Sequence, residues 1–572
     1  MNKLIQLRDI LNSYQRKQFI FLFFLMLVSM FLEISVLKFM LIILNYFSNP
    51  ESNVNSFIFM YINNLNINLE FSLLIVCIFV LVYLSKTLIN IFINYQKGRF
   101  LFFTKEKLSL EFMKGYLYMP RIFHMRSNTS GLIKNITVEV DNLMATLLAI
   151  SNMTLEFLVL AGLLIFLFFI NFQVTLISFF CLIIFSFFVS GINRKKTIQL
   201  GKERVKLVEL RLKNVIEGLS GSKTYTLTGS RDRAISNFNV NNNKIAQISY
   251  KTFFRHSLPK PLFELFVVLI IALFFISINE KNIQINLIIP TLGVFIAAVY
   301  RLIPSFANIM SNLQNYQYNV QCVTNLSRDL DKFKKIKNIN QEKIKFETII
   351  NFENASFSYE KNKKTEDNFI FKNLSITIKK GSKIGIVGSS GSGKSTFLDL
   401  MMGLLPLQNG NILVDGNSIE NYEDGWQKNI GCVPQEVFIT DDTLKRNIAF
   451  GLSENTINNE KLSKAIESAG LKNFTNNLDL KTDTIIGERG SRISGGQRQR
   501  IGIARALYHD PEVLILDEAT NALDEETEEK IVKEIFSISK GRTIIFVSHN
   551  YKNLKNCDHI YKIENKSLSL IK

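Results

Sequence analysis

A chain of 572 residues is long enough to form two or more domains. Lys and Arg number 67 against 49 Asp and Glu, which gives a formal net charge of +18, and 47% of the residues are hydrophobic. Because the apolar residues crowd into the first half of the chain, the positive charge is typical of basic loops facing an anionic membrane surface, and we expect no nucleic-acid partner. The five cysteines lie far apart and show no metal-ligand spacing.

The chain begins with Leu4, Leu7 and Leu11 at helical spacing among basic residues. This pattern predicts an amphipathic helix on the inner membrane surface, and a soluble N-terminal helix fits it equally well. Six apolar stretches follow, each long enough to cross a hydrocarbon core of about 30 Å. We expect transmembrane helices at 18–46, 71–96, 140–170, 173–193, 255–278 and 284–310.

The connections between these stretches differ in charge. No Lys or Arg occurs between Lys38 and Lys86, whereas 97–134 and 194–255 are rich in both. Because basic loops stay on the cytoplasmic side, this distribution predicts cytoplasmic N- and C-termini. The long basic segments keep helical periodicity, so we expect helices that extend below the membrane and contact a cytosolic domain. Solvated arms without a docking role are the alternative.

A polar stretch at 325–347 marks a change of composition. After it, short β-type runs alternate with helical segments, which is typical of an α/β domain with a parallel sheet. We therefore predict a membrane domain of six transmembrane helices over 1–335 and a cytosolic α/β domain over 336–572.

The α/β domain contains a glycine-rich loop between the apolar run 384–387 and the helical run 397–402. Strand, loop and helix in this order form a phosphate-binding loop, in which backbone N–H groups and the helix N-terminus face the phosphates. Lys394 would neutralise the β- and γ-phosphates of ATP, and the Ser395 hydroxyl would ligate Mg²⁺. A glycine-rich turn without a ligand is the alternative. The predicted loop residues are Gly388, Ser389, Ser390, Gly391, Ser392, Gly393, Lys394, Ser395 and Thr396.

A second chemical signal is the apolar run 513–516 followed by Asp517 and Glu518. By itself, such a run is more often the end of a core strand than a site. Placed after a phosphate loop, it predicts a metal-organising carboxylate at Asp517 and a base for the attacking water at Glu518.

At this point the chain resembles an ABC transporter along its whole length. The run Ile493-Ser494-Gly495-Gly496-Gln497 is similar to the family signature, although Leu is usual at the position of Ile493. The resemblance implies that Ser494, Gly495, Gly496 and Gln497 complete the ATP site of a second subunit.

Four further residues match positions of the family. Tyr359 matches the aromatic residue that stacks on adenine, and Gln435 matches the glutamine that contacts Mg²⁺ and the membrane domain. His549 matches the switch histidine at the γ-phosphate, and Asp524 matches the residue that couples the two sites. The alternatives are an ordinary strand tyrosine for Tyr359 and a structural histidine for His549.

The fused membrane domain, the six predicted spans and the segment 487–490 resemble an exporter-type half-transporter. With one phosphate loop per chain, the resemblance implies a homodimer with two ATP sites in the bacterial cytoplasmic (inner) membrane. The turns near 115–125 and 215–229 would transmit motion between the domains.

Charged residues inside the spans are the clue to the substrate, because an uncompensated charge there costs about 2.5–3.5 kcal/mol or more. Lys86, Lys260 and Arg301 would form a basic cavity for an anionic headgroup of a membrane lipid. Snorkelling of these cations, or pairing with acidic residues such as Glu33, is the alternative.

The stretch 298–305 resembles PglK-type flippases, which implies a polyprenyl-pyrophosphate-linked oligosaccharide as the substrate. A multidrug or lipid A exporter of the same architecture is the alternative.

Overall fold

The computed structural model describes residues 3–48, 71–170, 172–280, 289–334, 343–360, 369–421, 423–487, 490, 492–519, 525–538, 541–548 and 551–572. Contacts divide the chain into two compact units. The first, here the helical unit, consists of Met1–Met119 and Ser127–Lys335. The second, here the α/β unit, consists of Pro120–Arg126 and Ile336–Lys572. The short segment 120–126, which the sequence analysis placed in the membrane domain, groups with the α/β unit.

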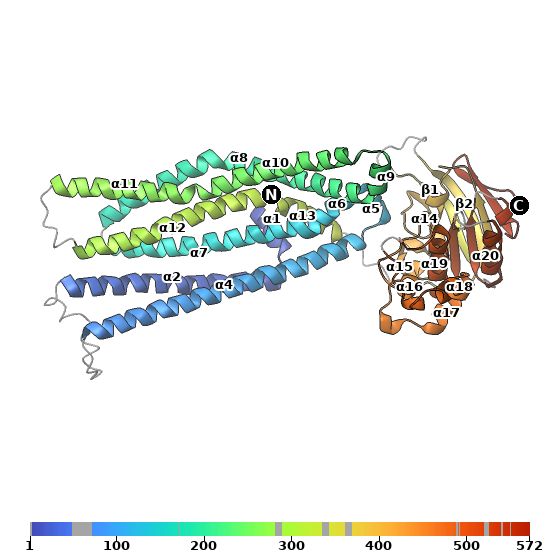
Figure 1. The fold of residues 1–572 in the computed structure, drawn as a ribbon, viewed down its shortest axis with the longest axis horizontal. Helices are drawn as coiled ribbons and strands as arrows, with labels where there is room; N and C mark the ends of the chain where they lie inside the picture. The colour runs from blue at the N-terminus through green and yellow to red at the C-terminus, as the bar shows by residue number, and fades with distance from the viewer. Residues whose placement is uncertain are drawn as a thin grey trace. The chain divides into compact units, whose positions relative to one another are not determined.

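The helical unit is a bundle of long helices (Figure 1). A short helix, α1, precedes the first long helix, and the six predicted spans fall on α2, α4, α7, α8, α11 and α12. The fifth span was predicted to begin at 255, in the last turn of α10, and residues 284–288 of the last span lie outside the described residues. The elements are α1 (Lys3–Ile10), α2 (Ser13–Ser48), α4 (Phe71–Leu117), α6 (Thr129–Lys134), the π-helical η2 (Asn135–Glu139), α7 (Val140–Ile170), α8 (Phe172–Ser220), α9 (Ser222–Leu227), α10 (Arg231–Ser257), α11 (Pro259–Glu280), α12 (Ile289–Asn319) and α13 (Gln321–Phe333).

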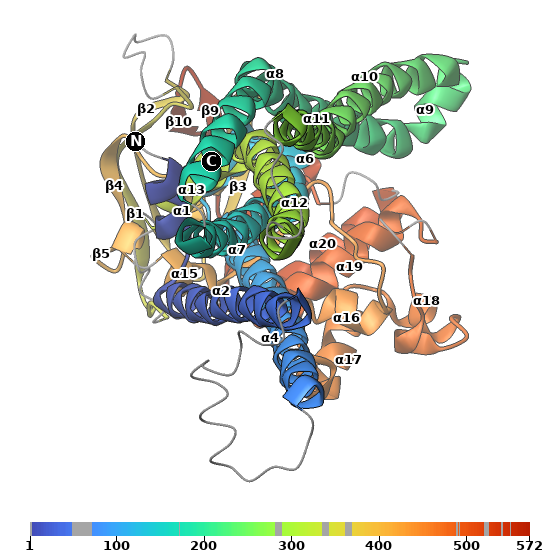
Figure 2. The ribbon, with the colours of Figure 1, turned by 90° about the vertical axis from the view of Figure 1, so that its left-hand side faces the viewer.

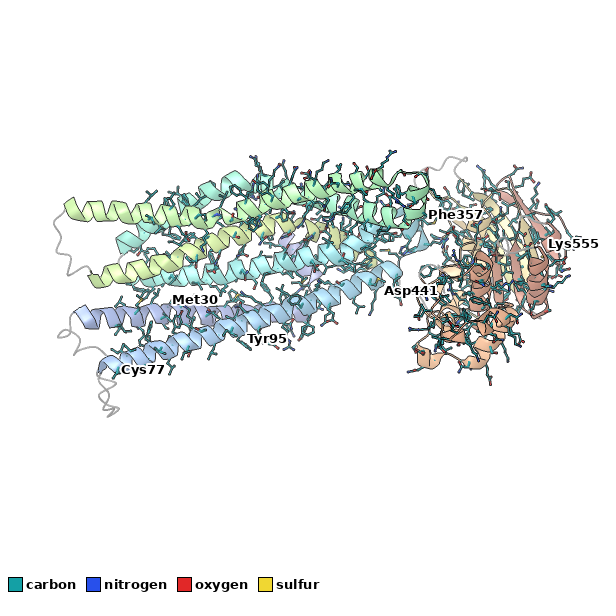
Figure 3. All side chains as sticks on the ribbon, in the orientation of Figure 1. Met30, Cys77, Tyr95, Phe357, Asp441 and Lys555 are labelled. Atoms are coloured by element: carbon teal, nitrogen blue, oxygen red, sulfur yellow. The ribbon has the colours of Figure 1, made fainter. Side chains whose placement is uncertain are left out.

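Three stretches of the described residues are long and apolar enough to cross a membrane: Ser13–Ile43, Ile75–Leu117 and Thr129–Ile170. Helix α4 shows why such a helix needs lipid around it. The labelled Tyr95 (Figure 3) is 64% exposed, and Leu88 and Ile91 are exposed on the same helix. A large apolar surface of this kind is unstable in water, so it indicates a lipid-facing side.

The core of the bundle lies where α7 packs against α2 and α12. Helices α7 and α12 run side by side in both views (Figures 1 and 2). Leu163 and Leu167 of α7 are buried there with Phe306 of α12. Gly162 permits the approach of α2, because a Cβ at this position would lie 2.8 Å from Cγ of Met30.

The α/β unit contains two sheets within its described residues. The antiparallel sheet has the order β2-β1-β4-β5, and the other has the order β10-β9-β3-β8-β7-β6, in which β9, β3, β8, β7 and β6 run parallel. The strands are β1 (Ile349–Phe357), β2 (Phe371–Lys379), β3 (Lys383–Val387), β4 (Asn409–Val414), β5 (Asn417–Ser418), β6 (Ile430–Val433), β7 (Val513–Asp517), β8 (Thr543–Val547), β9 (His559–Glu564) and β10 (Ser567–Leu570).

The helices of this unit complete its layers. They are α5 (Arg121–Arg126), α14 (Lys394–Met401), α15 (Glu423–Gln427), α16 (Leu444–Ile448), α17 (Asn459–Ser468), α18 (Lys472–Asn476), α19 (Gly495–Tyr508) and α20 (Glu525–Ile538).

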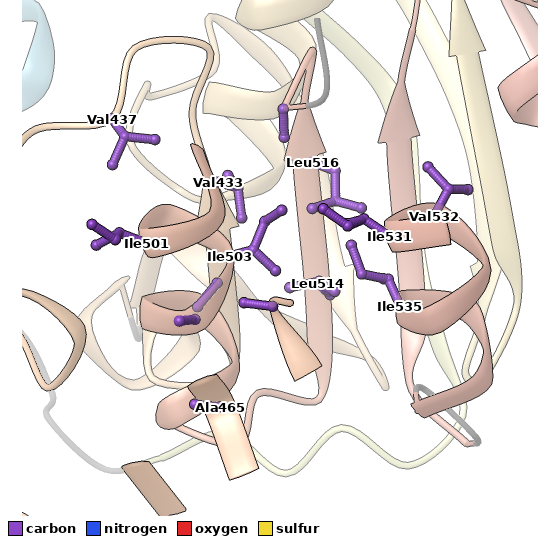
Figure 4. Packing of buried hydrophobic residues seen from close by; sticks show 14 of the residues in the cluster. Val433, Val437, Ala465, Ile501, Ile503, Leu514, Leu516, Ile531, Val532 and Ile535 are labelled. Carbon is purple, nitrogen blue, oxygen red and sulfur yellow. The ribbon is translucent and has the colours of Figure 1, made fainter. Parts of the chain in front are cut away.

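The larger sheet is buried on both faces, which explains why its central strands are continuously apolar. Leu514 and Leu516 of β7 pack on one face against Ile503 of α19 and Ile531 of α20 (Figure 4). Their neighbours Val513 and Ile515 belong to the core on the other face. Because consecutive strand residues point to opposite faces, a single run of apolar residues serves both cores.

Candidate functional site

The carboxyl ends of three parallel strands place the predicted ATP residues at one edge of the larger sheet. The glycine-rich loop follows β3, Glu518 follows β7, and Gln435 lies in the loop after β6. Strand β8 separates β3 from β7, and β6 pairs with β7. Ligands of parallel α/β sheets bind at this edge, where the loops after the strands converge.

The glycine-rich loop closes on its own lysine. Gly393, the N-cap residue just before α14, has φ +103°, a backbone conformation that residues with a Cβ disfavour. A Cβ on Gly388 would lie 2.5 Å from Oγ of Ser392, so the loop has no room for a larger residue there. Nζ of Lys394 donates to the carbonyl oxygens of Gly388 at 2.9 Å and Ser389 at 3.1 Å. The ammonium group therefore lies inside the curve of the loop, where phosphates would replace the carbonyl contacts.

Ser395 and Asp517 face each other across this site. The Ser395 hydroxyl donates to Oδ2 of Asp517 over a long 3.4 Å. Burial, and then the negative charge of Glu518, raise the pKa of Asp517 above its ordinary value, although Ser395 and Lys394 counteract them. A divalent cation would lower this pKa again, because its positive charge stabilises the ionised carboxylate. A hydroxyl and a carboxylate oxygen fit Mg²⁺, which keeps several waters and takes few protein ligands.

Glu518 is held in an unusual position. Its φ is +50°, and it is only 8% exposed. Its N–H donates to the carbonyl of Val547 at 3.1 Å, while Nε2 of Gln435 donates to its carboxylate at 2.9 Å. A non-glycine residue with positive φ costs on the order of 1–2 kcal/mol, so its surroundings must hold it there. This geometry brings the predicted base and Gln435 together, whereas His549 and Asp524 lie outside the described residues.

Tyr359 contacts the phosphate-loop helix. Its hydroxyl and Oγ1 of Thr396 are 3.0 Å apart, and its half-buried ring meets Phe357 edge to face. The ring therefore lies beside the predicted ATP site, and stacking on adenine stays a prediction.

The signature residues form a helix N-terminus that faces outward. Ser494 caps α19 by accepting from the N–H of Gln497 at 3.2 Å, and the Gln497 side chain accepts from the N–H of Ser494 at 2.8 Å. Ser494 and Gly495 are exposed. An exposed N-terminus with free backbone donors is a ready anion site, which suits phosphates brought by a second chain.

Comparisons with known proteins found relatives of this chain. The family model described as "ABC transporter" matches residues 371–521. The ATP-dependent lipid A-core flippase of Aliivibrio fischeri is 29% identical over 455 residues, covering 78% of this chain and 76% of that protein. That of Pectobacterium atrosepticum is 28% identical over 451 residues, covering 78% and 76%.

A solved structure shares the whole fold. It is described as a bacterial Atm1-family ABC exporter with ATP bound, and it matches with a TM-score of 0.78 at 22% identity, covering 95% of this chain and 94% of that one. Residues 371–521 match the ABC transporter family, and the chain has the fold of an ABC exporter half-transporter. It joins a helical membrane domain to an ABC-type ATPase domain and is an ATP-hydrolysing translocase.

The half-transporter contains an ion pair that the sequence analysis missed. Arg121 of α5 contacts the carboxylate of Asp399, on the phosphate-loop helix α14, at 2.9 Å. Burial raises the pKa of Asp399, and Arg121 partly offsets this effect. Arg126 donates to the carbonyl of Tyr359, and Ile122 packs against the adjoining core. The flanking Pro120 and the basic residues were the available signal, but no spacing rule connects Arg121 with Asp399.

The predicted substrate cations have different environments in the membrane helices. Lys86 is ion-paired with Glu33 at 2.9 Å, and both side chains are largely buried. Lys260 is exposed in the first turn of α11, and the side chain of Arg301 lies outside the described residues. No described contact brings these residues together.

A partly buried polar cluster elsewhere in the bundle was also missed. Nζ of Lys97 donates to Asn152 at 3.0 Å. The Glu156 carboxylate, one turn further along α7, accepts from Ser305 and Asn308 of α12 at 2.8 Å each. Lys97 was read only as part of a basic inside segment, because its burial depends on packing between α4 and α7.

Proposed function

We propose that two copies of this half-transporter form an ATP-driven flippase that moves a lipid with a phosphate-bearing headgroup to the outer leaflet of the bacterial inner membrane. The observation that carries the proposal is the similarity to proteins named lipid A-core flippases. An alignment of 455 residues is longer than 336–572, so it includes part of the helical unit. The similarity therefore concerns more than the ATPase.

This proposal changes the order of the two substrate predictions. A PglK-type flippase for a polyprenyl-pyrophosphate-linked oligosaccharide was the first expectation, and a lipid A exporter was the alternative. The relatives support the alternative. The pairing of Lys86 with Glu33 also weakens the argument for a cavity of free cations.

The ATP site supports a hydrolytic step in which Glu518 acts as the general base. Lys394 and the loop N–H groups would bind the β- and γ-phosphates, and Ser395, Asp517 and Gln435 would hold Mg²⁺. When bound, Mg²⁺ supplies charge neutralisation at the phosphates. Gln435 orients the Glu518 carboxylate through the 2.9 Å contact, and Glu518 would remove a proton from the attacking water.

Dimerisation would complete this site. Each chain supplies one phosphate loop and one exposed signature, so two chains would enclose two equivalent ATP molecules. The cap at Ser494 prepares the helix N-terminus of α19 for the γ-phosphate of the partner's nucleotide. ATP would hold the α/β units together, and hydrolysis would release them, with Asp524 and His549 expected to take part.

Flipping in proteoliposomes tests the proposal. The purified protein is reconstituted with lipid A or with a polyprenyl-pyrophosphate oligosaccharide, and exposure of each headgroup to an outside enzyme is measured with and without ATP. Glu518→Gln is the control without turnover. We expect ATP-dependent exposure of lipid A. Exposure of only the oligosaccharide lipid would restore the PglK-type assignment, and exposure of neither with active ATPase would exclude both substrates.

A further inference from the structure

The helical unit contains a cavity that takes no part in the ATP site. It lies among α6, α8 and α13, which run close together in the bundle (Figure 1), and its volume is about 700 Å³. Small-molecule sites are typically about 300–1,000 Å³, so this cavity can hold a ligand. Apart from the aliphatic Val205, the residues that line it are polar or charged. An apolar ligand would leave these groups without partners.

Ion pairs neutralise only part of the charge in this cavity. Its wall contains five cations and three carboxylates. Lys134 contacts Glu209 at 2.7 Å, and Lys332 contacts Asp329 at 2.7 Å. Asp329 also accepts a hydrogen bond from the Tyr116 hydroxyl at 2.8 Å. These two pairs therefore hold the wall together and use two of its three carboxylates.

Three cations and one carboxylate remain in the wall. They are Lys202, Lys206 and Arg328, with Glu203. In the part of the chain that the structure describes, none of these four has an ion-pair partner. Lys202 and Lys206 are one helical turn apart on α8, where like charges repel each other. An anion between α8 and Arg328 of α13 would relieve that repulsion.

The positive potential continues to the N-terminal helix. Lys3 of α1 donates to Gln321 in the cavity wall at 3.3 Å. Burial, and then repulsion by Lys202, lower the pKa of Lys3. Leu4 and Ile5 are exposed on the same helix, as expected for a helix on a membrane surface. A ligand could therefore reach the cavity from the cytosol or from the lipid headgroups beside α1.

We propose that this cavity binds a phosphate-bearing anion through Lys202, Lys206 and Arg328. Arg forms paired hydrogen bonds to phosphate oxygens, and Lys supplies a strong point charge. The ligand is either the headgroup of an acidic lipid or a soluble phosphate compound. The site is separate from the ATP site, and its binding does not depend on which lipid the transporter moves.

Binding of inorganic pyrophosphate to the full chain in phosphatidylcholine nanodiscs tests the proposal. The measurement uses a Lys394→Ala background, so that the phosphate loop does not contribute, and isothermal titration calorimetry as the readout. The cavity variant combines Lys202→Gln, Lys206→Gln and Arg328→Gln. The control variant combines Arg233→Gln, Lys244→Gln and Lys251→Gln, and it removes the same charge from exposed positions on α10.

We expect the cavity variant to bind pyrophosphate about tenfold or more weakly, since each cation contributes a modest amount, and the control to bind like the parent. Lys206→Gln alone should give part of the loss if the triple variant unfolds. Equal loss in both triple variants, or no binding by the parent, would overturn the proposal.

A second set of nanodiscs identifies the source of the phosphate. They contain phosphatidic acid as well as phosphatidylcholine. If pyrophosphate binding by the parent weakens there while the cavity variant is unaffected, the natural ligand is a lipid headgroup. If the parent binds equally well in both membranes, the cavity takes a soluble phosphate compound.

Discussion

In the α/β unit, the chemically important charges lie in loops at one edge of a parallel sheet, and Lys394 and Glu518 are held there by main-chain or amide groups. In the helical unit, charges inside the bundle are paired between helices, as Lys86 is with Glu33. In the first arrangement a ligand would replace neutral contacts, such as the carbonyl contacts of Lys394. The second stabilises the bundle, and a ligand would have to displace an existing partner.

A charged residue in an apolar segment therefore does not by itself indicate a substrate site. A cation indicates a binding site when no acidic side chain around it forms an ion pair with it. By that criterion Lys202, Lys206 and Arg328 are better candidates for binding than Lys86.

The largest effect should come from Glu518→Gln. Removal of a general base lowers turnover by about 10²–10⁴-fold, whereas ATP binding should persist because the phosphate contacts remain. Phosphate release and nucleotide affinity measure the two quantities. Glu564→Gln, an exposed carboxylate on β9, is the matched control and should keep full turnover. Normal turnover in Glu518→Gln would assign the base to another group.

The buried pair in the bundle should respond differently. Lys86→Met removes the ammonium group that pairs with the buried Glu33 carboxylate, and breaking such a pair costs about 3–5 kcal/mol of unfolding free energy. The double variant Glu33→Leu/Lys86→Met should recover much of that loss. Denaturant unfolding in detergent tests this double-mutant cycle. Additive losses would show that the two charges do not stabilise each other, and the contrast between the units would fail.

Arg121→Gln should have a moderate and pH-dependent effect. The pKa of Asp399 is already raised above its ordinary 3.8, and loss of Arg121 should raise it further. A raised carboxyl pKa gives stability that is fully present below the unfolded value and is lost as pH rises through the folded value. The loss of unfolding free energy relative to the parent should therefore be small in acid and grow to about 1 kcal/mol toward neutral pH. Melting temperatures of the two proteins across this pH range measure it. A stability difference between Arg121→Gln and the parent that shrinks with rising pH would contradict this prediction.

Tyr359→Phe should have the smallest effect. It removes the hydroxyl contact with Thr396, which is worth about 0.5–1.5 kcal/mol of stability, and it keeps the ring. If the ring stacks on adenine, ATP affinity should be retained in Tyr359→Phe and fall in Tyr359→Ala. Equal affinities in the two variants would show that the ring does not contact the nucleotide.

The parts that the sequence predicted well depend on short-range chemistry. The loop 388–396 lies between its strand and helix because glycine conformation and apolar runs are local properties. Glu518 was predicted from the apolar run that precedes it and Gln435 from a family resemblance, and their contact follows from the pairing of β6 with β7.

The parts that were missed depend on contacts between distant segments. Arg121 and Asp399 are far apart in the chain, and neither lies in a recognisable motif. The partners of Lys97 and Glu156 become evident only once α4, α7 and α12 pack together. Side-chain type and periodicity do not encode such pairings without the fold.

The assignment of segment 120–126 to the α/β unit has a practical consequence for dissecting the protein. A fragment that begins at 336 would lack this segment, although it would contain every predicted nucleotide residue. Its phosphate-loop helix would lose the guanidinium beside Asp399, and its core would lose the cover of Ile122. ATP affinity and solubility measured on that fragment would therefore be those of a destabilised domain. Adding a peptide of residues 118–128 in trans should restore part of both.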